Sequence, residues 1–204
     1  MPNIQLFDPL GNRKYLTSTE RQRFEAAAMR AEGLTGTFCL MLLNTGCRIS
    51  EAVNLRVRHI DFESKGAIFE TLKQRQKGIY RFVPLPENFL NMLNMVHDLR
   101  RRTQGKDKDQ FIWTSQWLEH RKQWTRKTAY SKVMDVMEAA ALSGLYATPK
   151  GLRHGFAITC LDKGVPLNMV QKWMGHSSVT TTAIYANAIG EEERAIASRL
   201  WASA

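Results

Sequence analysis

The last tyrosine of this chain follows a cluster of positively charged side chains. Lys150, Arg153 and His154 lie within five residues, and Tyr185 comes nine residues after His176. A tyrosine hydroxyl has a pKa of about 10, so it is a weak nucleophile at neutral pH unless its neighbours activate it. Lysine, arginine and histidine hold a phosphate and neutralise the charge that develops on it during displacement. The pattern therefore indicates attack by Tyr185 on a phosphodiester.

The spacing of these residues predicts how helices hold them. The first three stand at helical positions i, i+3 and i+4, so they share one helix face. His176 and Tyr185 cannot share a continuous helical face, because nine residues rotate the chain by about half a turn net. Ser177 or Ser178 is expected to cap a new helix between them. We therefore expect Tyr185 on a separate helix that can move against a fixed pocket.

Local signals predict a mostly helical chain. A capping box at residues 17–20 should start the first helix, and an apolar helix over residues 35–44 should end at Gly46. A further helix is expected over residues 49–55. Two later helices are marked by apolar residues at helical spacing, namely Phe89, Leu93, Val96 and Leu99, and then Tyr130, Val133, Met134, Met137 and Ala141.

The segment between Gly66 and Pro84 departs from the helical pattern. Its apolar residues alternate around a polar centre, which indicates a β-hairpin. The hairpin carries four cations with no acid between them, Lys73, Arg75, Lys77 and Arg81. The predicted fold class is therefore mainly α with a small antiparallel β-sheet.

Composition fits an intracellular protein that meets a polyanion. A chain of 204 residues with 44% hydrophobic content forms one medium domain or two very small ones, and its formal net charge of +10 suits nucleic acid. Cys39, Cys47 and Cys160 show no metal-binding spacing, so they are expected to be buried thiols. No signal peptide or membrane span is evident. These features predict a soluble cytoplasmic protein with no metal, no cofactor and no membrane partner.

Four blocks of the sequence resemble one protein family. TGCRISEAVNL, LKQRQKGIYRFVPLP, LRHGFAITCLDKG and MGHSSVTTTAIYAN occur in the order found in tyrosine recombinases of the phage-integrase and chromosome-dimer-resolving type. One block alone is a weak signal, whereas four in order, with the family's interval from histidine to tyrosine, are specific. The resemblance covers about residues 15–187. It implies the catalytic-domain fold of that family and double-stranded DNA as the partner.

The resemblance also implies a role for each matching residue. Arg48 and Arg153 would be the two catalytic arginines, whose planar guanidiniums bind phosphate oxygens, and Glu51 would orient Arg48. His176 would donate a hydrogen bond to the phosphate, and Tyr185 would be the nucleophile. Without the resemblance, Arg48 is a surface arginine paired with Glu51, and Tyr185 is a core tyrosine.

Lys150 departs from the family pattern, which usually has histidine three residues before the second arginine. From the same helix face as Arg153 a lysine still reaches the phosphate, but it supplies a point charge in place of an imidazole. The alternative is a lysine that faces solvent. His154 is expected to be a buried hydrogen-bonding support in preference to a phosphate ligand.

The family's catalytic lysine lies in the hairpin and protonates the departing 5′-oxygen. Lys73 is the favoured match, and Lys77 is its rival because this hairpin is a few residues longer than the usual form. Cations expected to contact DNA are Arg75, Lys77, Arg81, Arg121, Lys122 and Arg126. The tryptophans beside the last three, Trp113, Trp117 and Trp124, suit either a DNA-facing surface or core packing.

The domain organisation is predicted from the same resemblance. Residues 1–16 form a lead-in, residues 17–190 the catalytic domain, and residues 191–204 a C-terminal helix. Family members usually carry an N-terminal core-binding domain, which we do not expect in this chain, because only about 16 residues precede the first predicted helix. Carboxylates at 191–193 precede an apolar stripe formed by Ile196, Ala197, Leu200 and Trp201. The tail is expected to dock on its own domain or, as the family habit implies, in trans on a neighbouring protomer.

The predicted function is site-specific DNA recombination by a metal-independent strand transferase. The enzyme would cleave and rejoin DNA through a 3′-phosphotyrosine intermediate, in integration, inversion or resolution. The resemblance implies a homotetramer on paired DNA sites, with a monomer in the absence of DNA left open. Two other classes stay open, a DNA-binding regulator that does not cut and a type IB topoisomerase-like enzyme that relaxes DNA as a monomer.

Overall fold

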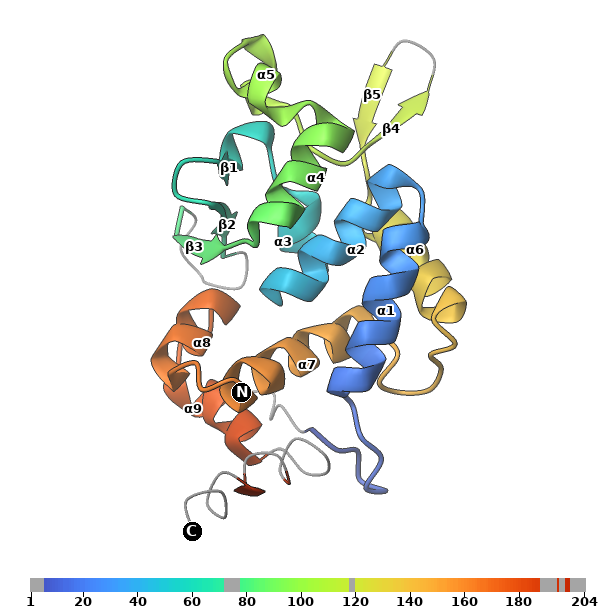
Figure 1. Ribbon diagram of the computed structural model, residues 1–204, viewed down its shortest axis with the longest axis vertical. Helices are drawn as coiled ribbons and strands as arrows, with labels where there is room; N and C mark the ends of the chain where they lie inside the picture. The colour runs from blue at the N-terminus through green and yellow to red at the C-terminus, as the bar shows by residue number, and fades with distance from the viewer. Residues whose placement is uncertain (1–5, 72–77, 118–119, 188–193, 195–196, 199–204) are drawn as a thin grey trace.

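The computed structural model describes residues 6–71, 78–117, 120–187, 194 and 197–198 (Figure 1). Its helices are α1 (Ser18–Arg30), α2 (Gly33–Thr45), α3 (Ile49–Val53), α4 (Glu87–His97), α5 (Leu99–Thr103), α6 (Arg126–Ala139), α7 (Pro149–Asp162), α8 (Leu167–Met174) and α9 (Val179–Ala183). Short 3-10 helices are η1 (Val57–His59), η2 (Lys106–Asp109) and η3 (Ile184–Asn187). The described chain is mainly helical, which confirms the predicted fold class.

The strands form two small antiparallel sheets. β1 (Ile60–Asp61), β2 (Gly66–Glu70) and β3 (Tyr80–Pro84) pair in that order, and β4 (Thr114–Trp117) pairs with β5 (His120–Gln123). The predicted hairpin is β2–β3, but residues 72–77 between its strands lie outside the described part. The sequence did not predict β1 or the second sheet. A two-residue strand is too short to show alternation, and β4 and β5 are almost wholly polar.

Helix ends follow the predicted local signals closely. The Thr17 hydroxyl accepts from the Glu20 amide, and the Glu20 carboxylate accepts from the Thr17 amide at 2.8 Å, so the capping box starts α1. Gly46 ends α2 in the left-handed region, with φ of 58°. The helix predicted over residues 49–55 ends earlier, at Val53, and Leu99 begins α5 instead of closing α4.

Helix α2 lies at the centre of the fold. It packs against α1, α4, α6 and α7, and almost all of its residues are buried. Figure 1 shows α7 crossing below α1 and α2, with α8 and α9 on the far side from the β4–β5 hairpin. This arrangement places α7 between the main core and the C-terminal helices.

The main core explains two of the tryptophans that the sequence left open. Trp113 and Trp124 pack on Phe38 with ring centroids 5.1 and 5.5 Å away, so both belong to the core and not to a DNA-facing surface. The side chain of Trp117 is outside the described part. Cys39, Cys47 and Cys160 are free and buried, as predicted. Among the described helices, none has the length and apolar character needed to cross a membrane.

A second, smaller apolar cluster lies below α7. It includes Leu6 and Tyr15 from the lead-in, Phe156 from α7, Met174 from α8 and Tyr185 from η3. The ring of Tyr185 is therefore part of a packed cluster that joins the lead-in to the C-terminal segment.

Candidate active site

Helix α7 is fixed tightly where it presents its functional residues. Thr148 caps it by accepting from the Gly151 amide at 3.0 Å, and Pro149 occupies the first turn. A Cβ at Gly151 would lie 1.8 Å from the Tyr146 carbonyl oxygen, and one at Gly155 would lie 2.5 Å from that of Leu16. The backbone at Leu16, before α1, and at Tyr146, before α7, therefore packs directly against the glycines of α7. The predicted face, with Lys150, Arg153 and His154, projects from its first turns.

Arg153 is buried and held by two backbone carbonyls. Its Nη1 donates to the Gly46 oxygen and its Nη2 to the Met174 oxygen, both at 2.6 Å, and Nη2 lies 3.0 Å from His176 Nε2. Gly46 caps the C-terminus of α2 and Met174 ends α8, where carbonyls carry partial negative charge. Burial lowers the Arg153 pKa to about 10, so the guanidinium stays charged at neutral pH.

Glu51 joins two arginines. Its carboxylate accepts from the Arg48 amide and from Arg48 Nη1, both at 2.8 Å, and from Arg81 Nη2 at 2.5 Å. Burial would raise the Glu51 pKa, but the guanidiniums of Arg81, Arg48 and Arg153 outweigh it and hold that pKa below its ordinary value. Arg48 therefore has the expected pairing with Glu51 and also lines a pocket with Arg153.

Arg81 does not lie where the sequence placed it. We expected it among the DNA-contacting cations of the hairpin, yet the residue is only 6% exposed and its guanidinium is bound to Glu51. The alternation of β3 gives the reason, because Arg81 and Val83 are buried on this strand, whereas Tyr80 is exposed. The structure thus contradicts a DNA-contacting role for Arg81.

His176 is buried at the turn between α8 and α9. Its Nδ1 lies 2.9 Å from Thr182 Oγ1, while Nε2 faces Arg153. Burial, together with the charges of Arg153 and Arg48, lowers the His176 pKa to about 3, so the imidazole is neutral. In this state both ring nitrogens have partners within the protein.

Tyr185 is 1% exposed, although it belongs to the short helix η3. Its hydroxyl lies 2.8 Å from His154 Nδ1, and its ring stacks on His176 with centroids 6.3 Å apart. Burial raises the Tyr185 pKa to about 12, against the opposing effect of Arg153 and Arg48. Burial, with Lys150 and Arg153, lowers the His154 pKa to about 3. The phenol is therefore protonated and held beside a neutral imidazole.

The predicted break before Tyr185 lies at Ser178. This residue caps α9 by accepting from the Thr180 amide at 3.2 Å. The chain then makes a five-residue helix followed by a 3-10 turn, and Tyr185 lies in that turn. Tyr185 is thus separated from His176 in the chain but stacked on it in space.

One pocket of about 650 Å³ collects most of the predicted residues. Its lining includes Arg48, Lys150, Arg153, His154, His176 and Tyr185, and also Arg126 and Tyr130 from α6 and Lys14 from the lead-in. Lys150 is exposed at this pocket, and Arg126 is the predicted DNA-contacting cation that joins it. The sequence reasoning missed Lys14, whose only local signal is the basic pair Arg13-Lys14.

The remaining predicted cations either lie outside the described part or do not line this pocket. Lys73, Arg75 and Lys77 lie within residues 72–77, outside the described part, as does the side chain of Arg121. Lys122 is exposed on β5 and does not line the pocket. Within the described ranges, no group of three or more His, Cys, Asp or Glu is placed to hold a metal ion.

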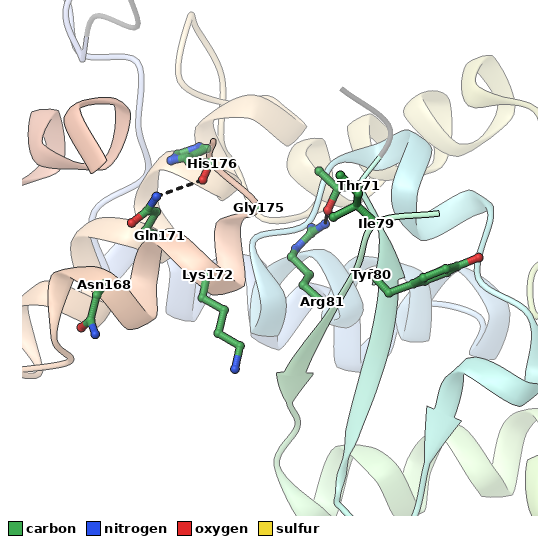
Figure 2. Close-up of a pocket in the computed structure, with 9 residues that line it drawn as sticks. All are labelled: Thr71, Ile79, Tyr80, Arg81, Asn168, Gln171, Lys172, Gly175 and His176. Carbon is green, nitrogen blue, oxygen red and sulfur yellow. Dashed lines mark hydrogen bonds between the residues drawn. The ribbon is translucent and has the colours of Figure 1, made fainter. Parts of the chain in front are cut away.

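A smaller pocket of about 310 Å³ opens between β3 and α8, on the other side of His176 (Figure 2). Arg81 and Thr71 line it from the sheet, and Gln171 and Lys172 from α8. Gln171 Nε2 donates to the His176 oxygen at 3.2 Å. His176 therefore belongs to the lining of both pockets.

Comparison with known proteins identifies the class. The chain matches the phage integrase family over residues 14–192 and belongs to it. It is 33% identical over 146 residues to the tyrosine recombinase XerA of Pyrococcus furiosus, covering 72% of this chain and 47% of XerA. It is 34% identical over 151 residues to the tyrosine recombinase XerD of Mycobacterium leprae, covering 71% and 45%. The chain thus spans about half the length of the curated relatives it matches.

Solved structures agree with this assignment. The crystal structure of XerA recombinase superimposes with a TM-score of 0.75 at 25% identity, over 91% of this chain and 64% of that one. XerH recombinase bound to a palindromic difH substrate gives 0.73 at 22% identity, over 98% and 57%. The resemblance found in the sequence is confirmed, and the fold is that of a tyrosine recombinase catalytic domain.

Proposed function

We propose that this protein is a site-specific DNA recombinase that cleaves and rejoins double-stranded DNA through a 3′-phosphotyrosine link to Tyr185. The observation that carries the proposal is the single pocket that brings Tyr185 together with Arg48, Lys150 and Arg153. Two relatives named tyrosine recombinases support it. The site-specific recombinase XerH, which shares the fold, was solved bound to its difH substrate. The surplus of basic residues supports DNA as the partner.

In the proposed reaction the Tyr185 hydroxyl releases its proton to solvent, and its oxygen attacks the scissile phosphorus and forms a P–O bond to the 3′-phosphate. The bond to the 5′-oxygen breaks, and that oxygen leaves as a 5′-hydroxyl after it takes a proton. A 5′-hydroxyl from a partner duplex then attacks the phosphotyrosine and reverses the step. The covalent link to Tyr185 retains the free energy of the broken phosphodiester bond, so rejoining the strand needs no nucleotide cofactor.

The cations of the pocket stabilise the charge that grows on the phosphate. Arg48 and Arg153 each present a planar guanidinium suited to two phosphate oxygens, and Lys150 adds a point charge. Because their guanidiniums are already fixed by protein contacts, they need little reorganisation during the reaction. Arg126 and Lys14 extend the same positive surface along the DNA backbone.

Tyr185 must become reactive from a buried, protonated state. The Tyr185 hydroxyl has a defined partner in His154 Nδ1. A phosphate bound beside Arg153 is negatively charged, so by itself it would not lower the pKa of Tyr185 or of His154. Movement of the η3 turn toward the DNA therefore belongs to the proposed cycle. His176 would exchange its contact with Arg153 for a hydrogen bond to the phosphate.

The departing 5′-oxygen also needs a proton donor. Lys73 remains the proposed general acid, with Lys77 as its rival. Alanine substitutions of Lys73 and of Lys77 distinguish the two candidate general acids. Loss of Lys73 should slow cleavage of an ordinary duplex while a duplex with sulfur in the 5′-bridging position is cleaved well, because a thiolate leaves without protonation. The same rescue in Lys77→Ala alone would assign the role to Lys77.

The proposed assembly is a homotetramer on two DNA sites, with residues 17–190 as the catalytic domain and residues 191–204 docking on a neighbouring protomer. Deleting residues 191–204 should leave a protein that binds one DNA site but fails to form higher-order complexes and recombines poorly. Native gel shifts with the full and shortened chains compare the two. Normal synapsis by the shortened chain would contradict docking in trans.

A nicked suicide duplex carrying the genomic sequence that flanks this chain's coding region tests the proposed function. Cleavage should release a short fragment and leave a denaturation-resistant protein–DNA adduct in the presence of a chelator. Binding without any adduct would indicate a regulator that does not cut. Relaxation of plasmids that lack a target, without recombinants, would indicate a topoisomerase-like enzyme.

A further inference from the structure

Arg81 is a buried arginine at the junction of three elements. Its Nη2 donates to Glu51 of α3 at 2.5 Å, its Nε to the Trp173 carbonyl of α8 at 2.8 Å, and its Nη1 to the Thr71 hydroxyl at 3.1 Å. Figure 2 shows its side chain between the strand and the end of α8. The fork of one guanidinium therefore fixes three separate segments relative to one another.

Two of these segments lead directly to the proposed phosphate site. Glu51 holds both the amide and the guanidinium of Arg48. Trp173 lies three residues before His176, and a Cβ on Gly175 would lie 2.9 Å from Arg81 Nη1. The close approach and the positive φ of 63° explain glycine at that turn. Arg81 thus sets the distance between Arg48 and the turn that carries His176.

An ordinary buried ion pair would not need this geometry. Taking a charged pair out of water is costly, and well-packed apolar residues often stabilise a core as well. The three directed hydrogen bonds instead use the planar fork that distinguishes arginine from lysine. We propose that Arg81 is a positioning residue for strand cleavage, which fixes Glu51 and Arg48 relative to the end of α8 that carries His176. The proposal rests on the proposed recombinase function.

The first test is single-turnover cleavage of a bound suicide duplex by Arg81→Gln. We expect DNA affinity within about threefold of wild type, because the side chain is buried, but cleavage slower by on the order of 100-fold, the usual effect of misplaced reacting groups. Arg101→Gln on α5, which removes an exposed arginine paired with Asp98, is the matched control and should cleave normally. A wild-type rate from Arg81→Gln would overturn the proposal.

The second readout is the ionisation of Glu51. The charged groups around it are Arg48 beside its own helix, Arg81 from β3 and Arg153 from α7, with the Cys47 thiol nearby. Arg81→Gln removes one cation, so the Glu51 carboxyl should titrate at a higher pH by carbon NMR of the DNA-free protein. Its cleavage defect should therefore deepen as pH falls. Arg81→Lys should restore the titration but not the rate.

Thr71→Val keeps the proposal testable if Arg81→Gln does not fold. It removes the Nη1 contact alone and should slow cleavage with little loss of stability. A loss of activity that follows the folded fraction, with an unchanged Glu51 titration, would show a purely structural role and overturn the inference. Absence of an adduct from the wild-type protein would instead contradict the recombinase function. The Glu51 titration would still test whether Arg81 controls the ionisation of Glu51.

Discussion

Helix α7 and the α9–η3 segment hold two halves of the same site by different means. Nine of the 14 residues of α7 are buried, and its glycines touch neighbouring backbone, so Arg153 stands on a rigid support. Helix α9 has five residues, of which Thr182 is buried, and it is followed at once by the turn that carries Tyr185. Arg153 therefore stands on a long packed helix, whereas Tyr185, although its ring is buried, stands on a short segment with a hydrogen bond from its hydroxyl to His154.

This difference fits the tasks proposed for the two halves. A site that stabilises developing charge works best when its donors are already in place. A nucleophile that is buried and protonated in the free protein must instead be released, and short segments with few buried residues open at lower free energy. Under the proposed function, the phosphate site would be preformed, and the attacking group would be withheld until DNA is bound.

The largest effect is expected from the nucleophile itself. Tyr185→Phe removes the attacking oxygen and should abolish the covalent adduct, while DNA binding stays close to wild type. Tyr130→Phe is the matched control, because Tyr130 lines the same pocket and is exposed. Denaturing gels of suicide-duplex reactions measure both. An adduct of normal yield from Tyr185→Phe would refute the assignment.

Arg153→Lys tests the rigid half. One ammonium cannot reach both the Gly46 and Met174 carbonyls, so about 1–3 kcal/mol of folding free energy should be lost. Cleavage should fall about 10²–10³-fold, as for removal of one oxyanion donor. Arg48→Lys is the comparison, since the Arg48 side chain is partly exposed and forms an ion pair with Glu51.

Urea unfolding and single-turnover rates separate the two effects in these variants. Arg48→Lys should lose activity with a smaller loss of stability than Arg153→Lys. Equal losses of unfolding free energy in the two variants would contradict the distinction between the buried Arg153 and the partly exposed Arg48.

Lys150→Ala should affect cleavage without affecting folding, because the side chain is exposed. We expect a loss of about 2 to 4 kcal/mol of transition-state stabilisation. Lys150→Arg and Lys150→His should keep a substantial share of the rate if the charge matters more than proton transfer. Wild-type cleavage by Lys150→Ala would mean that the lysine only faces solvent.

The last prediction concerns the acid stability of the fold around Tyr185. His154 and His176 have pKa values of about 3 in the folded protein, against about 6.5 when unfolded, so the unfolded chain binds the extra protons. The free energy of unfolding should therefore fall as pH falls from about 6.5, by up to about 1.4 kcal/mol per pH unit for each histidine. The slope should be shallower in His154→Phe, and an unchanged slope would contradict this account.

Local features of the fold were predictable from the sequence, and long-range ones were not. Thr17, Gly46 and Ser178 act through hydrogen bonds or dihedral angles within a few residues, so their signals are readable in the chain itself. Strands β4 and β5 lack apolar alternation, so their local sequence does not predict them.

The candidate site divides in the same way. Spacing and family resemblance indicated the residues that gather at the pocket, and helical periodicity correctly grouped Lys150, Arg153 and His154. The burial of Arg81 depends on Glu51, 30 residues earlier, and on the Trp173 carbonyl, 92 residues later. Lys14 reaches the pocket because the lead-in packs beside α7. Neither placement leaves a pattern in neighbouring residues.

Arg153 is stabilised by carbonyls at the ends of two helices, and no carboxylate of the described residues forms an ion pair with it, while Arg48 and Arg81 share Glu51. Three guanidiniums thus surround one carboxylate, and their mutual repulsion is weakly screened in a buried region. An anion placed among them relieves that repulsion. Binding of a phosphodiester should therefore stabilise the folded protein as well as supply the substrate. We expect duplex DNA to raise the melting temperature of the protein, and added salt to reduce this increase.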